Sequence, residues 1–493
     1  MEKRYRSVEL VDSRLGFWGK FFGGCIMVFF ISILIFLPLI LVNVGAVDYL
    51  YLENEGEESV HPVVEYIFRD KRKDESREDY LKIKMNPAFL NDEGNDVPRI
   101  VNFYSPWCGH CQHYKPIYIR EARIVIEKYP EIQFYGVSCT IHTKLCKKQE
   151  IRGYPTVKLF PPGATDVGKE LKRPITAKRI KDLLDSLNVQ EPVTDEKPLS
   201  TIKQENQDLN QNIDDAKKAR KIEEVKPFQW VDRNDVFHDA LASFEFALKN
   251  SIFMTNDALD IDKRRTLHDW LTIIGQVSRL SRQSLSHTES SPLIRLHLLS
   301  STLLAQIDHI SENEENLSQT LHDLSADRKE DKWTHACNKN GNHGYTCGLW
   351  QLFHLMTIGI AKSHHQSSSE TMGPSHVAET LRDYIQHFFA CDVCRTHFLH
   401  MYDECHFDRC NRFENGNDPS GHQLALWLWE VHNAVNVRLY HERMAESNEN
   451  AIITKEDDQK VKWPSIESCP KCWNTDGSYN EDEIFNALEK QYW

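Results

Sequence analysis

Two Cys-x-x-Cys motifs in different surroundings constrain this chain more than any other sequence feature. The first, Cys108-Gly-His-Cys111, follows the β-branched and aromatic run from Arg99 to Tyr104, which predicts a strand leading into a helix that begins at the cysteines. The second, Cys391-Asp-Val-Cys394, lies in a C-terminal region rich in Trp and His. Because a helix start stabilises a thiolate and His110 adds a potential cation, we expect Cys108 to be a reactive thiol. Two redox pairs on one polypeptide predict that electrons pass between them.

The other cysteines also occur as close neighbours. Of the 13 cysteines, only Cys25 stands apart, in an apolar N-terminal stretch, and the other 12 form six pairs. Beyond the two motifs these pairs are Cys139/Cys146, Cys337/Cys347, Cys405/Cys410 and Cys469/Cys472. An even set of short-range pairs predicts structural disulfides in an oxidising compartment, although spacing alone leaves the connectivity open. For the last pair, a third redox centre is the alternative to a structural disulfide.

The N-terminal segment predicts a membrane anchor. Residues 21–47 contain no charged side chain and are long enough to span a bilayer. Basic residues precede this segment and acidic residues follow it, so the positive-inside rule places residues 1–20 in the cytosol. The alternative is a cleaved signal peptide ending near Ala46, but the apolar run is longer than such peptides have. We therefore expect a single-pass type II membrane protein of the secretory pathway, with its catalytic domains lumenal or extracellular.

Composition argues against one broad class of function. The net charge is −14, and Lys and Arg form no basic stripe. Nucleic-acid binding depends on such clusters of basic residues, so no nucleic-acid partner is expected. The length of 493 residues allows several domains with cores of their own.

Shifts in composition predict a multidomain protein that combines an α/β domain with all-α domains. Segments 132–139 and 152–160 read as further strands, and the polar stretch after residue 190 reads as a linker. Apolar residues at helical spacing then predict a cysteine-free spacer and a helical bundle. The predicted boundaries are 1–20 for a cytosolic tail, 21–47 for the anchor, 60–190 for the α/β domain, 191–226 for the linker, 227–325 for the spacer, 326–476 for the bundle and 477–493 for a C-terminal tail.

Aromatic, histidine and asparagine side chains share helix faces in the predicted bundle. Trp350 and His354 are four residues apart on one predicted helix, and Trp429, His432 and Asn433 lie close together on another. Any one of these histidines alone would be a hydrogen-bonded core residue. Together they predict a planar, hydrogen-bonding cofactor inside the bundle, because buried polar groups need partners and bundle interiors hold such cofactors.

Five motifs follow one another in an order that points to a single family. They are Trp107-Cys-Gly-His-Cys111, Cys347-Gly-Leu-Trp-Gln-Leu-Phe-His354, Phe389-Ala-Cys-Asp-Val-Cys-Arg-Thr-His397, Leu426-Trp-Leu-Trp-Glu-Val-His-Asn-Ala-Val-Asn436 and Trp463-Pro-Ser-Ile-Glu-Ser-Cys469-Pro-Lys-Cys472. With these motifs, the chain resembles the quiescin sulfhydryl oxidases over nearly everything after residue 80. The resemblance implies a thioredoxin-like α/β domain, a helical spacer and an Erv-type helical bundle that binds FAD. With one thioredoxin domain, the layout is similar to the plant and protist branch.

The resemblance also implies roles for residues that match the motifs. Cys391 and Cys394 would be the flavin-proximal pair, with Cys394 next to the isoalloxazine ring and Cys391 exchanging with the first pair. His343 stands where animal members have an Arg. The residues that would line FAD are His343, Trp350, His354, His397, Trp429, His432, Asn433, Val435, Asn436, Lys460 and Trp463. Cys139–Cys146 and Cys337–Cys347 match structural disulfides of the family.

Two positions bear on the thioredoxin-like active site. In thioredoxin-like proteins a cis proline faces the redox pair, and Pro155 stands at that place. Many relatives carry a buried Glu in the strand before the active site, where this chain has Asn102. An amide cannot accept and release a proton near neutral pH. We therefore expect water or another group to handle the proton of Cys111.

The resemblance implies an FAD-dependent thiol oxidase. Cys108 would form a mixed disulfide with a reduced or unfolded protein of the secretory pathway, and Cys111 would resolve it. Electrons would then pass to Cys391/Cys394, FAD and dioxygen, giving hydrogen peroxide. No metal is expected. The sequence Asn316-Leu-Ser318 is a glycosylation sequon, which suits a lumenal location.

Two other classes of function are alternatives. One is a membrane-anchored thioredoxin-like disulfide isomerase with a zinc-binding C-terminal interaction module, whose ligands would come from Cys391, Cys394, Cys405, Cys410, His397 and His406. This alternative leaves the Trp and His helix faces without a role. The other is a scaffolding protein with structural disulfides only, which leaves the reactive Trp-Cys-Gly-His-Cys motif unexplained. Flavin absorbance and thiol titration distinguish the three.

Overall fold

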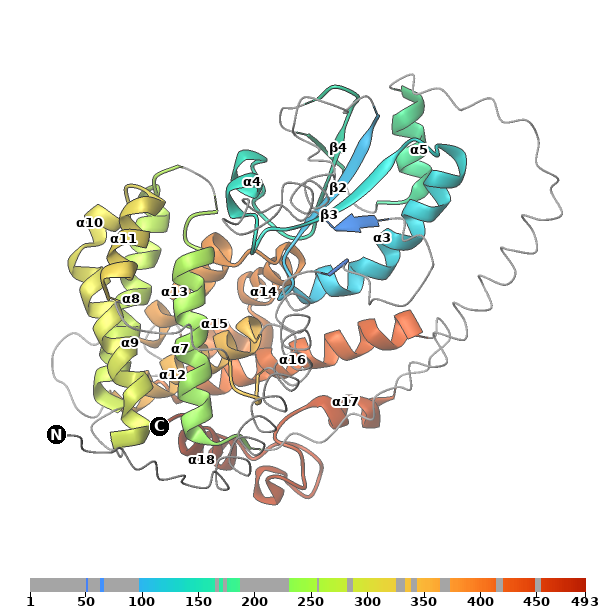
Figure 1. The fold of residues 1–493 in the computed structure, drawn as a ribbon. Helices are drawn as coiled ribbons and strands as arrows, with labels where there is room; N and C mark the ends of the chain where they lie inside the picture. Colours follow the sequence, from blue (N-terminus) through green and yellow to red (C-terminus); the bar gives the residue numbers. More distant parts are fainter. Residues whose placement is uncertain are drawn as a thin grey trace, which may run out of the picture.

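The fold is described from a computed structural model. The first Cys-x-x-Cys motif lies in an α/β part of the protein and the second in a helical part. The structure describes residues 50–51, 63–65, 97–164, 168–171, 175–186, 230–254, 257–281, 287–324, 333–337, 344–363, 373–413, 420–447 and 454–493. An α/β part and a larger helical part lie side by side (Figure 1).

The α/β part is built on a five-stranded sheet with the strand order β1-β3-β2-β4-β5. The strands are β1 (Val63–Glu65), β2 (Arg99–Tyr104), β3 (Gln133–Ser138), β4 (Thr156–Phe160) and β5 (Lys169–Glu170). Strands β1 and β2 run parallel to β3, and β4 runs antiparallel to β2. The strands predicted from the alternation of β-branched and aromatic residues are confirmed at β2, β3 and β4. Strand β2 is the central strand of the sheet. The first Cys pair follows its last residue and therefore lies at the edge formed by the carboxyl end of this strand.

Helices flank this sheet. Helix α3 (Gly109–Lys128) begins directly after Cys108, and α5 (Ala177–Ser186) packs beside it (Figure 1). The short α4 (Thr143–Lys148) follows β3. Helix α3 buries Tyr118, Ala122 and Val125 against the sheet, since these residues recur at helical spacing. The start of α3 is therefore fixed by apolar packing further along the same helix.

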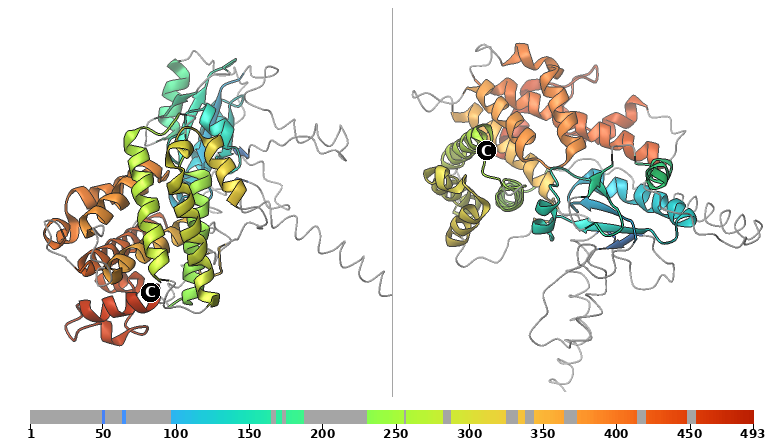
Figure 2. Two further views of the ribbon diagram at one scale, coloured as in Figure 1. Left: turned by 90° about the vertical axis from the view of Figure 1, so that its left-hand side faces the viewer. Right: turned by 90° about the horizontal axis from the view of Figure 1, so that it is seen from above.

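The helical part contains a spacer and a C-terminal group of helices. The spacer consists of α7 (Arg233–Asn250), α8 (Ile261–Ser281), α9 (His287–Ala305), α10 (Ile307–Ile310) and α11 (Glu314–Leu324). The C-terminal group consists of α12 (Tyr345–Ser363), α13 (Pro374–Phe388), α14 (Asp392–Asp403), η2 (His406–Asp408), α15 (Arg409–Arg412), α16 (His422–Ser447), α17 (Lys455–Val461), η3 (Pro470–Cys472) and α18 (Glu481–Tyr492). Figure 2 shows the spacer helices packed beside the C-terminal helices.

The spacer shares a core with the C-terminal helices. Helices α7 and α8 both pack against α12. A Cβ atom at Gly348 would lie 2.3 Å from the Asp239 carbonyl oxygen, and one at Gly359 would lie 2.2 Å from Val277 Cγ1. These two glycines let the helix backbones approach closely, as small residues do at helix crossings. The predicted spacer therefore packs as part of one helical body.

The last residues also belong to this body. Segment 477–493, expected as a C-terminal tail, contains helix α18, which packs against α12 and α16. Its Tyr492 is buried and stacks on His354 with ring centroids 5.0 Å apart. The periodic residues Ile484, Phe485 and Leu488 form the buried face. The prediction of a C-terminal tail is therefore wrong. A helix of this length is stabilised mainly by tertiary packing, which the local sequence does not reveal.

Five disulfides close local loops among the residues that the structure describes. They join Cys139–Cys146, Cys337–Cys347, Cys391–Cys394, Cys405–Cys410 and Cys469–Cys472, as the pairing by proximity predicts. Cys108 and Cys111 are free thiols. The Tyr154–Pro155 peptide bond is cis, as predicted for this position.

The prediction of a single-pass type II membrane protein is corrected here. No helix in the described part of the chain is long and apolar enough to cross a bilayer. Segment 21–47, on which the prediction depends, lies outside the described residues, as do segment 1–20 and the predicted linker 191–226.

Candidate functional site

The first Cys pair occupies the N-terminus of α3. Cys108 is the residue before the helix, and its carbonyl oxygen accepts hydrogen bonds from the backbone N–H groups of Cys111 and Gln112 at 2.9 and 3.2 Å. Cys108 and Cys111 are 1 % and 0 % exposed. The Cys108 Sγ points toward the carbonyl oxygen of Tyr154, 3.9 Å away. The helix start places partial positive charge beside the pair, which favours thiolate chemistry.

The second Cys pair occupies an equivalent place on α14. Cys391 precedes the helix, and its carbonyl oxygen accepts a hydrogen bond from the Arg395 N–H at 2.8 Å. Cys391 and Cys394 are joined by a disulfide, and Cys391 is 0 % exposed. Each redox pair thus lies at the start of a helix, the first in the α/β part and the second in the helical part.

Backbone pairing brings the two helix starts together. The Tyr154 N–H donates to the Ala390 carbonyl oxygen at 2.7 Å, and the Asp392 N–H donates to the Tyr154 carbonyl oxygen at 3.3 Å. These bonds form a one-residue parallel β-bridge between Tyr154 and Cys391. The loop before the cis proline therefore docks on the segment that carries the second pair. We call this contact the docking interface.

His110, which belongs to the first motif, contacts the second pair. Its Nδ1 is 3.5 Å from the Cys391 Sγ and 3.4 Å from the Cys394 Sγ. Its Nε2 is 3.9 Å from a carboxylate oxygen of Glu442. Burial lowers the pKa of His110 to about 4, and Glu442 only partly opposes this shift. The expectation of a cation at this position is therefore corrected: the docked imidazole is neutral at physiological pH.

Aromatic side chains from both parts complete the docking interface. Trp107 is 6 % exposed. Its ring lies 4.8 Å from that of Tyr345, 5.8 Å from that of Phe389 and 6.4 Å from that of Phe246, measured between centroids. These partners come from α12, the end of α13 and the spacer helix α7. Aromatic rings at these separations stabilise a contact beyond their buried area, so Trp107 anchors the docked arrangement.

His110 predicts a lower pH limit for docking. Its pKa falls from 6.5 to about 4 on burial, so an undocked His110 takes up a proton more readily than the docked one. Docking should be at full strength above pH ~6.5 and weaken toward pH ~4, by up to about tenfold per pH unit. Energy transfer between fluorophores on the two parts measures the docked fraction. His110→Asn should remove this pH dependence, and an unchanged profile in that variant would contradict the assignment to His110.

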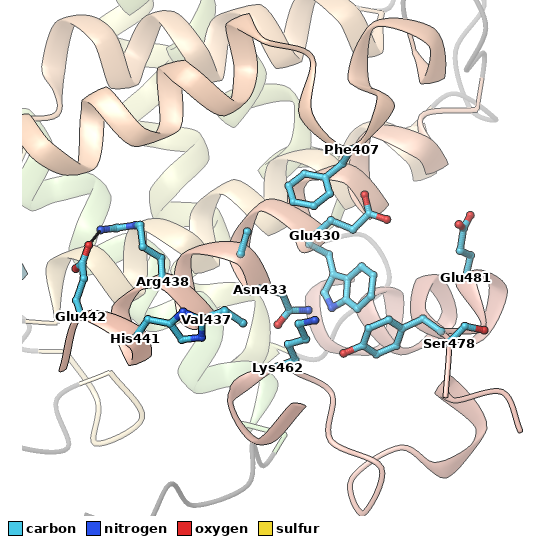
Figure 3. A pocket seen from close by; sticks show the side chains of 13 residues that line it. Phe407, Glu430, Asn433, Val437, Arg438, His441, Glu442, Lys462, Ser478 and Glu481 are labelled. Atoms are coloured by element: carbon cyan, nitrogen blue, oxygen red, sulfur yellow. Dashed lines mark hydrogen bonds and ion pairs between the residues drawn. The ribbon is translucent and has the colours of Figure 1, made fainter. Parts of the chain in front are cut away.

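A pocket of about 700 Å³ opens beside the docking interface. Figure 3 shows Glu442 and Arg438 at one end and Ser478 and Glu481 at the other. Through Glu442 the pocket reaches His110 and so the sulfurs of the second pair. Its lining combines aromatic rings, an amide, basic groups and carboxylates: Phe407, Trp429, Glu430, Asn433, Arg438, His441, Glu442, Lys462, Tyr479 and Glu481.

The predicted cofactor residues divide into two neighbouring groups. Trp429 and Asn433 line the pocket. Trp350 and His432 stack with ring centroids 4.1 Å apart and planes 3° from parallel, next to His354 and Trp463. The Asn433 side chain joins the two groups, because its amide donates to the Trp463 carbonyl oxygen and accepts from the Trp463 N–H, both at 2.8 Å.

The buried histidines suit a neutral, hydrogen-bonding environment. His354 Nε2 lies 3.0 Å from His432 Nδ1. Burial lowers the pKa of His354 well below its ordinary value and that of His432 to about 3, so both rings are neutral. Among the described residues, the buried Nδ1 of His354 and the hydroxyl of Tyr479 lack a hydrogen-bond partner. Such groups need a ligand or ordered water.

The remaining predicted cofactor residues are less central. His397 is an exposed residue of α14. The partial burial of its ring, and to a smaller extent the positive charge of Arg438, lower its pKa. Val435 and Asn436 are half-buried on α16 and do not line the pocket. Lys460 is exposed and pairs with Asp457 at 2.7 Å, whereas Lys462 lines the pocket. His343 lies outside the described residues.

Sequence reasoning missed the charged end of the pocket. Arg438, His441 and Glu442 lie beyond the motif that ends at Asn436, and Tyr479 lies in the segment expected as a tail. A signal was present, because Trp429, Asn433, Val437 and His441 recur every four residues and so share one face of α16. Extending that face to the end of the helix would have found Val437 and His441.

Comparison with known proteins agrees with this arrangement. The Erv1 / Alr family model matches residues 347–459, and the thioredoxin model matches residues 84–186. Sulfhydryl oxidase 1 of rice is 24% identical over 435 residues, 80% of this chain and 73% of the relative. Sulfhydryl oxidase 1 of Arabidopsis thaliana is 25% identical over 480 residues, 90% and 79% of the two chains. The chain belongs to the quiescin sulfhydryl oxidase family. It is a thiol oxidase.

One solved structure matches about half of this chain. The sulfhydryl oxidase fragment of human QSOX1 is 22% identical, covers 52% of this chain and 94% of its own, and superposes with a TM-score of 0.39. The assignment of this sulfhydryl oxidase to its family depends on the two domain models and on the plant relatives, which it matches over 73% and 79% of their length.

The zinc alternative fits this sulfhydryl oxidase poorly. Its ligand set requires thiolates from four cysteines, but Cys391 is bonded to Cys394 and Cys405 to Cys410. Zinc binds the thiolate form of cysteine, which a disulfide lacks.

Glycosylation of Asn316 stays a prediction. Its side-chain amide, in α11, donates to the His309 carbonyl oxygen at 2.9 Å and to Glu312 at 3.0 Å.

Proposed function

We propose that this thiol oxidase forms disulfides in reduced or unfolded proteins by a relay from Cys108/Cys111 to Cys391/Cys394, with FAD as cofactor and dioxygen as the final acceptor. The observation that carries the proposal is the docking interface. It joins the loop beside the dithiol to the segment that carries the disulfide, and it places the imidazole of the first motif within 3.5 Å of both disulfide sulfurs. A dithiol and a disulfide are the reactants of thiol–disulfide exchange.

The substrate step takes place at the first pair. When Cys108 and Cys111 are joined by a disulfide, a substrate thiolate attacks Cys108 and forms a mixed disulfide, releasing the Cys111 sulfur. A second substrate thiolate displaces Cys108. The expectation that Cys111 resolves this mixed disulfide is corrected here, because attack by Cys111 would release the substrate still reduced. The substrate gains a disulfide, and Cys108 and Cys111 are left as a dithiol.

The interdomain step takes place in the docked arrangement. The Cys108 sulfur attacks Cys391 and releases the Cys394 sulfur, and Cys111 then attacks Cys108 and releases Cys391. The two electrons and two protons of the first pair are thereby transferred to the second. His110, neutral and near both sulfurs of the second pair, can take up and pass on one of these protons.

The backbone of Tyr154 couples the two steps. In thioredoxin-like sites an extended substrate pairs with the backbone beside the redox pair, as an added strand does at a sheet edge. In the docked arrangement the Tyr154 N–H and carbonyl oxygen are already paired with Ala390 and Asp392. Substrate and second pair therefore compete for the same edge, and the first pair must alternate between them.

The site fits FAD by its chemistry. Rings such as Trp429 and Tyr479 suit a flat aromatic system, and Lys462 suits phosphate. Arg438 and His441 would bind phosphate on leaving their carboxylate partners Glu442 and Asp458. His354 Nδ1 and the Tyr479 hydroxyl provide hydrogen-bonding groups without protein partners among the described residues. When bound, FAD would accept the electrons of the second pair and pass them to dioxygen, giving hydrogen peroxide.

The relay predicts a trappable link. A Cys111→Ser, Cys394→Ser double variant leaves Cys108 and Cys391 without resolving partners, so a disulfide between them should accumulate under mild oxidation. Mass spectrometry of the digested protein detects the linked peptides. The matched control, Cys108→Ser with Cys394→Ser, removes the thiol that points toward Tyr154 and leaves Cys111 inside α3, so it should give little linkage. Absence of the 108–391 link, or equal linkage in the control, would refute the relay.

A further inference from the structure

The segment from Cys405 to Cys410, here called the 405–410 loop, lies beside the pocket and takes no part in the relay. Its two end residues form a disulfide, and Phe407 in its middle lines the pocket. Figure 3 shows the Phe407 ring at the rim of the pocket, next to Glu430. Both cysteines are half-buried, so a small thiol can reach their disulfide.

The backbone of the 405–410 loop adopts a conformation that its residues disfavour. The φ angles of Cys405, Phe407 and Asp408 are 55°, 56° and 58°. In this left-handed region a side chain crowds its own backbone, and a bulky residue such as Phe is rarely found there. Such conformations persist only where the surrounding structure imposes them, and they cluster at functional sites. Opening the disulfide would let these residues return to ordinary backbone angles.

A buried arginine lies against both sulfurs of this pair. The Arg409 Nη2 donates to the Cys410 Sγ at 3.0 Å and to the Cys405 Sγ at 3.6 Å. Its Nε donates to the Tyr402 carbonyl oxygen at 2.9 Å, and its guanidinium carbon lies 4.0 Å from the centroid of the Tyr402 ring. Arg409 is 7 % exposed, so its charge acts on the sulfurs with little screening by solvent. A neighbouring guanidinium stabilises a thiolate, and a stabilised thiolate leaves a disulfide more readily.

We propose that Cys405–Cys410 is a redox-active disulfide, which the thiols oxidised by this enzyme also reduce, and that its opening withdraws Phe407 from the pocket. The inference goes beyond the proposed function. Reduction of this pair requires neither the relay nor a cofactor. Only the effect on the pocket rests on the proposed binding of FAD.

The opening step is a thiol–disulfide exchange in which atoms and electrons balance. A substrate thiolate attacks the Cys405 sulfur, forms a mixed disulfide with it and breaks the Cys405–Cys410 bond. Cys410, the sulfur nearer to Arg409, leaves as a thiolate that the guanidinium stabilises. A second substrate thiolate then attacks the sulfur of the first and releases Cys405, which takes up a proton from water. The two substrate thiols lose two electrons and gain a disulfide, and the protein pair becomes a dithiol.

The test is a redox titration of every disulfide in the full chain, in the absence of oxygen. The protein is equilibrated with mixtures of reduced and oxidised dithiothreitol, and its free thiols are alkylated. Mass spectrometry of the digest then gives the reduced fraction of each pair. Cys405–Cys410 should be half reduced at a ratio of reduced to oxidised dithiothreitol roughly tenfold or more below that for Cys139–Cys146, whose cysteines are 1 % and 4 % exposed. Equal ratios for the two pairs would overturn the proposal.

The role of Arg409 is tested against a matched arginine. Arg409→Met removes the charge but keeps an apolar side chain of similar length, and it should raise the ratio at half reduction about tenfold. Arg409→Lys, which keeps the charge, should recover part of this shift. Arg382 lies over the same Tyr402 ring, 5.9 Å from its centroid, but pairs with Asp403. Arg382→Met should therefore leave the ratio nearly unchanged, and equal shifts in the two methionine variants would overturn the proposal. If Arg409→Met fails to unfold cooperatively, Arg409→Gln replaces it with the same expected shift.

The effect on the pocket is measured as affinity for FAD. Cys405→Ser with Cys410→Ser opens the 405–410 loop permanently and should weaken FAD binding about tenfold, because an aromatic wall of the pocket is lost. Cys469→Ser with Cys472→Ser is the control, since the residues between these cysteines do not line the pocket. Unchanged affinity in the first variant, or an equal loss in the control, would overturn the effect on the pocket. A parent chain that binds no FAD would refute the proposed cofactor and leave the titration of the disulfides unaffected.

Discussion

Replacing Cys394 by serine is expected to abolish oxidation of every thiol substrate while leaving the proposed FAD cofactor bound. The pocket and the Trp350–His432 stack do not depend on this sulfur, so cofactor absorbance should persist. Without Cys394 the second pair cannot form its disulfide and has no oxidised state to receive electrons. Oxygen consumption with dithiothreitol or with a reduced protein should fall on the order of 10³-fold or more, as when one member of a unit that acts together is removed.

The chain offers a close control for this variant. Cys469 and Cys472 form a second disulfide of identical spacing, with a Cα–Cα distance of 5.4 Å against 5.3 Å for Cys391–Cys394. Cys469→Ser with Cys472→Ser should retain most of the turnover, because the structure places no free thiol of the described residues beside that pair. Near-normal turnover of Cys394→Ser would show that another group donates electrons to the cofactor. Loss of turnover in the control at unchanged stability would make that pair a third redox centre.

Replacing Gly153 by leucine is expected to separate oxidation of proteins from oxidation of small dithiols. A Cβ atom at this position would lie 3.3 Å from Asp392 Cβ and 3.5 Å from the Ala390 carbonyl oxygen, so a larger side chain cannot fit in the docking interface. The redox residues themselves remain in place. Loss of docking removes the effective concentration that joins the two pairs, so oxidation of reduced proteins should fall by about 100-fold or more. Dithiothreitol, which reaches the second pair directly, should be oxidised at least as fast as before.

A graded series controls for general damage to the fold. Gly153→Ala requires a shift of only a few tenths of an ångström from its neighbours and should lose much less activity than the leucine variant. Thermal unfolding of both variants reports whether the fold is intact. Undiminished oxidation of proteins by Gly153→Leu would mean that the first pair passes its electrons on without this interface. The first pair would then serve only to bind substrates.

Features that depend on neighbouring residues were predictable from the sequence. Alternating β-branched and aromatic residues predicted β2 at Arg99–Tyr104, and the helix beginning at Cys108 followed from the motif. Disulfides between close cysteines were predictable for the same reason, because a short loop leaves few other partners. The Trp and His residues of α12 and α16 were expected on shared faces, and the structure brings Trp350, His354 and His432 together.

Features that depend on segments far apart in the chain were not predictable. The neutral state of His110 results from burial against Cys391, Cys394 and Glu442, and nothing near His110 in the sequence signals that burial. Helix α18 has an apolar face, but its place against α12 depends on the matching surface of that helix. Sequence reasoning accordingly gave His110 the wrong charge and placed α18 in a tail.

The sequence by itself determined which residues carry the redox chemistry, because thiol spacing and helix starts are properties of a few adjacent residues. Only the tertiary structure decided how those residues work together. It paired Tyr154 with Cys391, placed Glu442 between the pocket and His110, and set Phe407 at the pocket. The physical reason is that such contacts require two surfaces to exclude water and match in shape. That match is fixed by packing across the whole chain, which local periodicity does not encode.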